Sequence, residues 1–299
     1  MQHRRISSIN HPIDISFQTL NTIYESKSEP KIEIIKIKDN GLALVIQDDI
    51  QFLESQHHHY HEVMAHTPCR YNEDVKDVLI LGGGDGGICT EILKYPSVNN
   101  VTVVDISKEV VDLCIEYFPN ISKGLLDPKT KIFYENACDW IKNNEDKYDL
   151  IFIDTTDFNL EDNNNTIVNP SCQKSKETNL RDSNNIFNCI NSLNKNGILT
   201  FNHDFCGLES HSIYVKESFL RQQFKDTIPF KSNIPYFPGN QYCFLMCSNS
   251  PFKRFKDLNF SINNIQTEVY NRNSHLASLF ISKEYESFFI EGEMDIEKC

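Results

Sequence analysis

A buried strand that leads directly into a cluster of glycines constrains the fold of this chain more than any other feature. The segment DVLILG at residues 77–82 is apolar, and the run from Gly82 to Gly87 is glycine except at Asp85. A helical pattern follows over residues 87–94. A strand, a glycine turn and a helix in this order predict a βα unit whose turn can receive a nucleotide-like ligand.

Strand and helix patterns continue to alternate as far as residue 224. This alternation predicts a Rossmann-like α/β fold with a doubly wound, mainly parallel sheet. A last apolar run, QYCFLMCS, has no helix pattern directly before it, so we expect that strand to pair antiparallel. The predicted strands are 77–82, 100–106, 131–135, 148–154, 197–203 and 241–248, and the predicted helices are 87–94, 107–118, 137–144, 184–194 and 209–224.

The beginning of the chain has a different pattern, with short apolar runs, tight-turn signals and no helix between them. We therefore expect a small N-terminal antiparallel β domain over residues 1–55 and a Rossmann-like catalytic domain over residues 56–299. The apolar runs that support this division are 31–36, 41–47 and 50–54.

The composition disfavours two classes of partner. The chain has 29 Lys and Arg against 42 Asp and Glu, a formal net charge of −13, which opposes binding to a nucleic-acid polymer. No apolar run reaches the roughly 18 residues that a membrane span needs. No apolar segment of the secretory type follows the N-terminus. We expect a cytoplasmic protein without a membrane partner.

The glycine turn matches the pattern Gly82-x-Gly84-x-x-Gly87, which is typical of dinucleotide sites but also occurs in turns with a purely structural role. Asp85 distinguishes between the ligands. A pyrophosphate would lie at the N-terminus of the following helix, and a carboxylate in the turn would repel it. A ligand with a sulfonium and an ammonium group would be attracted, so the turn favours an S-adenosylmethionine-type ligand over NAD.

Polar residues after the next two strands are candidates for binding the rest of a nucleoside. Asp105 ends its strand about 20 residues after the turn, where an acidic side chain binds ribose hydroxyls. Asn136 follows the third strand, where its amide could bind an adenine edge or could cap the helix that begins there. The sequence leaves both roles open for Asn136.

The histidine-rich segment QHHHYHEVMAH invites comparison with metal sites. His61 and His66 flank a near-match to HExxH, but they are five residues apart and would lie roughly 140° apart around a helix. His57 and His61 could share an ion, yet the sequence offers no evident third ligand. We expect no metal, and we expect Tyr60 and His61 to line a cleft.

Several motifs in sequence order resemble the spermidine synthase (polyamine aminopropyltransferase) family. They are GGGDGG, VVDISKEVVDLC, ENACDWI, DTTD, IPYFPGNQYCFLMCS and YNRNSHLASLF. The resemblance implies a seven-stranded methyltransferase-type sheet behind a small β domain, and a homodimer. It also implies transfer of an aminopropyl group from decarboxylated S-adenosylmethionine, with release of methylthioadenosine.

The resemblance also implies roles for individual residues. Asp105 would hold the ribose, Asn136 the adenine, and Asp85 the cationic aminopropyl tail of the donor. The implied donor-binding residues are Gly82, Gly84, Asp85, Gly87, Asp105, Ile106, Asn136 and Ala137, and the implied acceptor-binding residues are Tyr60, His61, Asp157 and Phe237.

Asp154 ends the strand YDLIFID and Asp157 follows three residues later; both are candidate catalytic residues. An acceptor amine with a pKa near about 10.4 must lose a proton before it attacks, and an ordinary Asp with a pKa near about 3.9 is a weak base for it. We therefore expect Asp157 to orient the acceptor and relay its proton. Asp154 would supply negative potential. An Asp turn that caps the strand is the structural alternative.

The chain departs from the family on the acceptor side. The family's D-S-S-D-P-x-G-P-A reads DTTDFNLED here, and Phe237 lacks the hydroxyl of the tyrosine usual at its position. We expect residues 158–183 to form a mobile loop beside the acceptor. The acceptor is then either a polyamine such as putrescine or a bulkier molecule, such as a peptide–nucleotide antibiotic of the microcin C type.

Two other functions are compatible with the same fold. The first is a methyltransferase or 3-amino-3-carboxypropyltransferase that uses intact S-adenosylmethionine. Asp85 disfavours it, because the methionine carboxylate would meet a like charge. The second is a non-catalytic binding protein, which the presence of both Asp154 and Asp157 disfavours.

Overall fold

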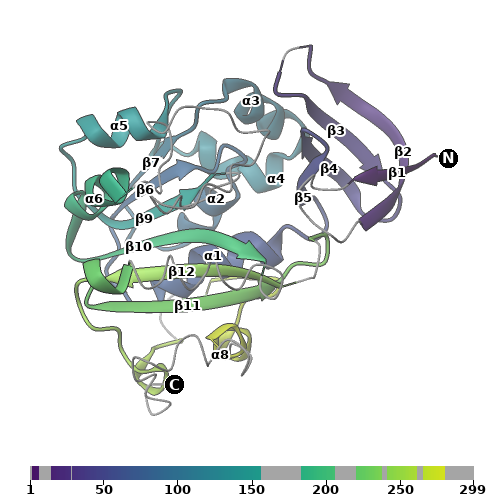
Figure 1. Ribbon diagram of the computed structural model, residues 1–299. Coiled ribbons are helices and arrows are strands. Elements are labelled where there is room, and N and C mark those ends of the chain that lie inside the picture. Colours follow the sequence, from purple (N-terminus) through teal and green to yellow (C-terminus); the bar gives the residue numbers. More distant parts are fainter. Residues whose placement is uncertain are drawn as a thin grey trace, which may run out of the picture.

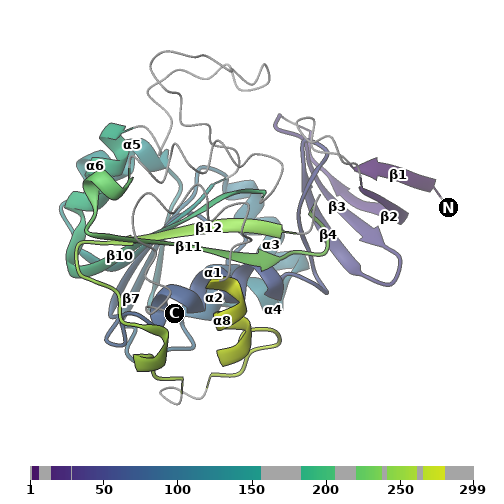
Figure 2. The ribbon, with the colours of Figure 1, turned by 60° about the horizontal axis from the view of Figure 1, so that its bottom comes forward.

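Two β-sheets organise the part of the chain that the computed structural model describes (Figure 1). A five-stranded sheet lies beside a larger, seven-stranded sheet, and the two views agree on this arrangement (Figures 1 and 2). The predicted combination of a small antiparallel sheet with a larger α/β unit is confirmed. The described residues are 2–6, 15–27, 29–155, 183–205, 220–237, 241–260 and 265–279.

The five-stranded sheet is an antiparallel meander in which each strand pairs with the next one along the chain. Gln47 and Asp48 join the last two strands, and their φ values of 52° and 67° suit a two-residue hairpin turn. The sequence predicted the last three strands and missed the first two. The domain boundary after residue 55 remains a prediction. The strands are β1 Gln2–Ile6, β2 Ile15–Glu25, β3 Ile32–Ile37, β4 Gly41–Ile46 and β5 Asp49–Leu53.

The seven-stranded sheet has the order β11-β12-β10-β9-β6-β7-β8. The strands from β6 to β10 are parallel, and β12 pairs antiparallel with both β10 and β11, as predicted for the last strand. The edge strand β11 was not predicted. The bounds are β6 Asp77–Gly82, β7 Asn100–Val104, β8 Thr130–Phe133, β9 Tyr148–Asp154, β10 Leu193–Phe205, β11 Asp226–Asn233 and β12 Gln241–Ser248.

Helices cover both faces of this sheet. Successive side chains of β6 point to opposite faces and pack against different helices. Val78 and Ile80 pack in the core that includes helices α1 and α2, whereas Leu79 and Leu81 pack in a second core with α5 and α6. Figure 2 shows α5 and α6 on one side of the sheet, with α1, α2 and α8 on the other. The helices are α1 His58–Cys69, α2 Gly87–Ile92, α3 Lys108–Tyr117, α4 Pro119–Ser122, α5 Ala137–Asn143, α6 Ser183–Asn191 and α8 Arg272–Leu279, with 3-10 turns at Lys123–Leu126 and Phe255–Asp257.

The structure bears on the predicted N-cap at Ser107 and on the helix predicted over residues 209–224. Ser107 caps α3, because its side-chain oxygen accepts a hydrogen bond from the Val110 N–H at 3.2 Å. Only the end of the helix predicted over 209–224 lies among the described residues, and residues 220–223 are helical. In the part of the chain that the structure describes, no helix is both long and apolar enough to cross a membrane.

The strand order creates a switch point between β6 and β9. The chain runs outward from β6 through β7 to β8, and then crosses to β9 and β10 on the other side of β6. Gly82 at the end of β6 lies in register with Asp154 at the end of β9. Open α/β sheets bind ligands in the crevice at such a point, beyond the carboxyl ends of the strands. The predicted glycine turn and Asp154 therefore meet where a ligand is expected.

Candidate active site

The glycine turn after β6 brings three predicted site residues into direct contact with the rest of the site. Gly82 is in register with the end of β9, whereas Gly84 and Gly87 each lie against a side chain. A Cβ atom on Gly84 would stand 2.6 Å from Oδ2 of Asp105, and one on Gly87 would stand 2.3 Å from Nδ1 of His61. Both distances are too short for a real side chain, so packing requires glycine at these positions whether or not a ligand is bound.

Asp105, directly after β7, is held by backbone N–H groups. Its Oδ2 accepts a hydrogen bond from Gly84 at 2.9 Å, and its Oδ1 accepts one from Ser107 at 2.8 Å. Burial raises the pKa of the Asp105 carboxyl, although both hydrogen bonds oppose the rise. The neighbouring side chain of Ile106 is 70% exposed. A fixed carboxylate and an exposed apolar side chain thus stand together, which suits a nucleoside.

Asn136 caps the helix that begins after β8. Its Oδ1 accepts hydrogen bonds from the N–H groups of Cys138 at 2.8 Å and Asp139 at 3.4 Å. Of the two roles that the sequence left open, capping is therefore observed. Since the carboxamide oxygen is used for capping, Asn136 would meet an adenine through its Nδ2–H group. Ala137 opens α5 beside it and is partly buried.

His61 and Asp85 form an ion pair beneath the glycine turn. Nε2 of His61 lies 3.3 Å from Oδ2 of Asp85, and Oδ1 of Asp85 accepts the Gly87 N–H at 2.7 Å. Burial alone would lower the pKa of His61 and raise that of Asp85. The attraction between them outweighs burial, so the pKa of His61 is raised and that of Asp85 is lowered. The structure thus places His61, predicted on the acceptor side, against a predicted donor-binding carboxylate.

His57, at the N-cap of α1, and His66, within α1, also have buried polar partners. Nδ1 of His57 lies 3.0 Å from Nδ1 of His61, and burial followed by the charge of His61 lowers the pKa of His57 to about 2. His57 is therefore neutral, and its contact with His61 is a hydrogen bond whose donor depends on the tautomers of the two rings. His66 instead contacts Glu91 at 2.9 Å and the Tyr95 hydroxyl at 3.1 Å. Among the described residues, no group of three or more His, Cys, Asp and Glu side chains is placed to hold a metal ion.

Asp154 is the most strongly perturbed carboxyl of the site. The Tyr60 hydroxyl donates to its Oδ1 at 2.5 Å. Burial, and then the nearby charge of Asp85, raise the pKa of Asp154 to about 7, while Tyr60 and His61 oppose the rise. An added positive charge would shift this carboxyl to its ionised form. Asp157, the second predicted catalytic residue, lies outside the described residues.

An aromatic wall stands next to this carboxyl. The ring of Tyr60 lies 6.4 Å from Phe237, 5.8 Å from Tyr242 and 5.2 Å from Phe244, between centroids. Phe237 was predicted to face the acceptor, but Tyr242 and Phe244 were not recognised. A signal for them existed, because residues two apart on a strand share one face of the sheet. The two rings of β12 therefore point to the same side as each other, toward Tyr60.

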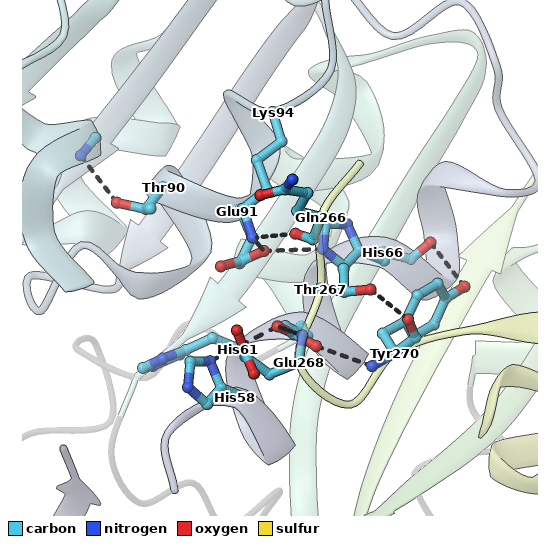
Figure 3. A network of polar contacts seen from close by, with 12 residues as sticks. His58, His61, His66, Thr90, Glu91, Lys94, Gln266, Thr267, Glu268 and Tyr270 are labelled. Carbon is cyan, nitrogen blue, oxygen red and sulfur yellow. Dashed lines mark hydrogen bonds and ion pairs between the residues drawn. The ribbon is translucent and has the colours of Figure 1, made fainter. Parts of the chain in front are cut away.

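A buried polar network fixes the helix that carries Tyr60 and His61 (Figure 3). The carboxylate of Glu62 accepts the backbone N–H groups of Glu268, Val269 and Tyr270 at 2.7, 2.9 and 2.9 Å. In the same network, Lys94 of the segment after α2 donates to the Gln266 carbonyl at 2.8 Å (Figure 3). The chain before α8 is thus tied to α1 and to the segment after α2.

Comparison with known proteins agrees with this geometry. The family model of the spermine/spermidine synthase domain matches residues 57–257. The chain is 30% identical to a polyamine aminopropyltransferase of Buchnera aphidicola subsp. Acyrthosiphon pisum, covering 87% of this chain and 88% of that one. It is 29% identical to the polyamine aminopropyltransferase of Alkaliphilus metalliredigens, covering 89% of this chain and 90% of that one.

Solved structures support the fold. The spermidine synthase from Thermotoga maritima superposes with a TM-score of 0.81 at 20% identity, covering 95% of this chain and 96% of that one. A spermidine synthase in complex with the transition state analogue AdoDATO superposes with a TM-score of 0.80, also at 20% identity. With the family match and the curated relatives, the conclusion is that the chain belongs to the spermine/spermidine synthase family and is an alkyl-transferring enzyme of the aminopropyltransferase type.

Proposed function

We propose that this enzyme transfers the aminopropyl group of decarboxylated S-adenosylmethionine to an amine of a small molecule. One observation carries the proposal: Asp85 and Asp154 lie close together at the switch point, close enough for the charge of Asp85 to raise the pKa of Asp154. Two carboxyls so placed attract a ligand with positive charge at both its sulfonium and its amine. The glycine turn, Asp105 and Asn136 would hold the nucleoside part of that ligand.

The proposed reaction is a single displacement. The lone pair of the acceptor nitrogen attacks the methylene carbon that is bonded to sulfur. The new N–C bond forms while the C–S bond breaks, and its electron pair stays on sulfur in methylthioadenosine. The acceptor amine must lose a proton before the attack to free its lone pair, and the new secondary amine nitrogen takes up the positive charge that sulfur loses. Methylthioadenosine is neutral at sulfur, so the carboxylates would attract it less strongly than they attract the donor.

In this proposal Asp154 and Asp157 have different roles: Asp154 supplies negative charge and Asp157 relays the proton. In the ligand-free site the pKa of Asp154 is about 7, which is closer to that of an amine, about 10.4, than the ordinary value of about 3.9. A bound sulfonium lowers that pKa again, so Asp154 would act mainly as a negative charge beside the reacting carbon. The proton relay stays with Asp157 in this proposal.

The choice between decarboxylated and intact S-adenosylmethionine depends on the net charge around the donor tail. His61 offsets part of the charge of Asp85, so Asp85 alone is a weaker barrier to a methionine carboxylate than the sequence indicated. Asp154 adds a second acid that a carboxylate would have to approach. This arrangement favours the decarboxylated donor over methyl or 3-amino-3-carboxypropyl transfer from the intact one.

The proposed acceptor is a polyamine such as putrescine, because the curated relatives are named polyamine aminopropyltransferases and the site combines acids with an aromatic wall. A bulkier acceptor, including a peptide–nucleotide, would have to be admitted by residues 158–183, all of which lie outside the described residues except Ser183 at the start of α6. The homodimer implied by the family remains a prediction.

Product identification tests this proposal. The enzyme is incubated with either form of S-adenosylmethionine and a panel of diamines, polyamines and peptide–nucleotides, and the products are analysed by mass spectrometry. We expect methylthioadenosine and an aminopropylated amine from the decarboxylated donor. A methylated or 3-amino-3-carboxypropylated product from the intact donor would overturn the donor assignment. Aminopropylation of a phosphate in place of an amine would overturn the acceptor assignment.

A further inference from the structure

Tyr236 carries a buried hydroxyl group that has no role in the proposed reaction. The residue is 2% exposed, and its hydroxyl oxygen has no hydrogen-bond partner among the described residues. Buried hydroxyls are nearly always hydrogen-bonded, because leaving one unpaired lowers stability. An unpaired buried hydroxyl close to a binding site is therefore a candidate to accept a hydrogen bond from a ligand.

The surroundings of Tyr236 connect it to the two carboxyls of the site, Asp85 and Asp154. After burial, the charges of Asp85 and Asp154 are the main causes that raise the pKa of Tyr236. The ring of Tyr236 also packs against that of Phe237 at 4.8 Å. Ring contacts thus lead from Tyr236 through Phe237 to Tyr60, 6.4 Å away between the last two centroids, and the Tyr60 hydroxyl donates to Asp154 at 2.5 Å.

The turn that carries Tyr236 is held firmly against α1. The Ser232 hydroxyl at the end of β11 donates to the His59 carbonyl at 2.5 Å, and the Phe237 N–H donates to the Ile234 carbonyl at 3.1 Å. The first contact ties the end of β11 to the first turn of α1, and the second closes the turn around Tyr236. The backbone that carries Tyr236 is therefore fixed relative to the start of α1.

The surroundings define the chemistry that this hydroxyl can recognise. The pKa of Tyr236 is raised well above 10.0, so the phenol is neutral and its oxygen can accept a hydrogen bond. An anionic group would be repelled by the two carboxyls, whereas an ammonium group would be attracted and would bring N–H donors. The partner that fits is a primary amine in its protonated form.

We propose that the Tyr236 hydroxyl accepts a hydrogen bond from a primary ammonium group held near Asp85 and Asp154. This inference rests on the proposed function, and it adds a specificity-determining residue to it. The ammonium group belongs either to the aminopropyl tail of the donor or to the acceptor. In both cases Tyr236 provides the hydroxyl group that the neighbouring Phe237 lacks.

The substitution Tyr236→Phe tests this role, because it removes only the hydroxyl. Tyr148→Phe is the matched control: it removes a phenol hydroxyl from the other core, away from the site. For each variant we would measure the midpoint of thermal unfolding without ligand, the acceptor KM, and the Kd of decarboxylated S-adenosylmethionine and of methylthioadenosine. Methylthioadenosine lacks the amine and so reports on the nucleoside part alone.

A hydrogen bond to a charged group corresponds to an affinity change of about 10- to 100-fold. If the donor amine is the partner, the Kd of decarboxylated S-adenosylmethionine rises by this factor in Tyr236→Phe, and that of methylthioadenosine does not change. If the acceptor is the partner, its KM rises instead and both donor constants stay constant. In either case the unfolding midpoint stays the same or rises, because an unpaired buried hydroxyl has been removed.

Two results would overturn the inference. The first is a Tyr236→Phe enzyme with unchanged donor Kd and acceptor KM. The second is a fall in the unfolding midpoint with equal losses of affinity for decarboxylated S-adenosylmethionine and methylthioadenosine, which would indicate a structural role. If the wild-type enzyme transfers an aminopropyl group to no amine, the proposed function fails, and the comparison of the two nucleoside constants still decides whether Tyr236 binds an ammonium group.

Discussion

Replacing Asp154 by Asn should stabilise the ligand-free enzyme above neutral pH. The pKa of Asp154 is raised from 3.8 to about 7 by burial and by Asp85. Below pH 3.8 this residue is protonated in both the folded and the unfolded chain. As the pH rises toward 7, the unfolded chain ionises while the folded site stays protonated, so unfolding becomes easier. The stabilisation is thus present at low pH and is lost as the pH rises through the folded pKa.

The size of this effect follows from the difference in pKa. A difference of about 3 units corresponds to about 4 kcal/mol over the whole range, of which roughly 2.5 kcal/mol falls between pH 5 and pH 8. Asn has the shape of Asp and keeps an oxygen that can accept the Tyr60 hydroxyl, so Asp154→Asn removes the ionisation and little else. The variant should therefore lose less stability than the wild type over this range.

Urea unfolding at pH 5 and pH 8 measures the difference. The free energy of unfolding of the wild type should fall by up to about 2.5 kcal/mol more than that of Asp154→Asn. Asp112→Asn is the control, because Asp112 lies on the exposed side of α3 paired with Lys108, and its profile should parallel that of the wild type. Parallel profiles for wild type and Asp154→Asn would refute the reasoning, since Asp154 would then titrate alike in both states.

Two further variants test the polar network around Glu62 and the donor site. Glu62→Ala removes the acceptor of three backbone N–H groups and should lower the free energy of unfolding by about 3 kcal/mol or more. The control is Glu73→Ala, at an exposed ion pair, whose free energy of unfolding should stay within about 1 kcal/mol of that of the wild type. Asp105→Asn should weaken methylthioadenosine binding by about 10- to 100-fold in calorimetry, and an unchanged Kd would remove Asp105 from the ribose role.

Local sequence patterns predicted the central strands of the parallel part, such as β6 and β9, because these strands are buried on both faces. Such strands read as continuous apolar runs, as in β6 and β9. The edge strand β11 was missed for the opposite reason. It is polar and contains Pro229, which an edge strand tolerates because one side of it forms no ladder. Its identity as a strand depends on pairing with β12, which no local pattern reveals.

The sequence predicted those site residues that directly end or follow an apolar strand pattern, such as Asp105 and Asp154. The site could not be predicted where partners come from distant segments. The His61–Asp85 ion pair joins α1 to the glycine turn, and it changes the charge that Asp85 presents to a ligand. The Tyr236 hydroxyl, which has no partner in the described part of the chain, is likewise visible only once its surroundings are known. Electrostatic balance within a site depends on such tertiary contacts.

Donor-binding calorimetry tests the central claim most directly, namely that the two carboxyls at the switch point select a cationic, decarboxylated donor. Decarboxylated S-adenosylmethionine, intact S-adenosylmethionine and methylthioadenosine are titrated into the enzyme at pH 7 in buffers of different ionisation enthalpy. We expect the decarboxylated donor to bind tightest and its binding to release about half a proton from Asp154, a release that Asp154→Asn abolishes. Equal affinity for the intact donor, with no proton released on binding either one, would contradict this claim.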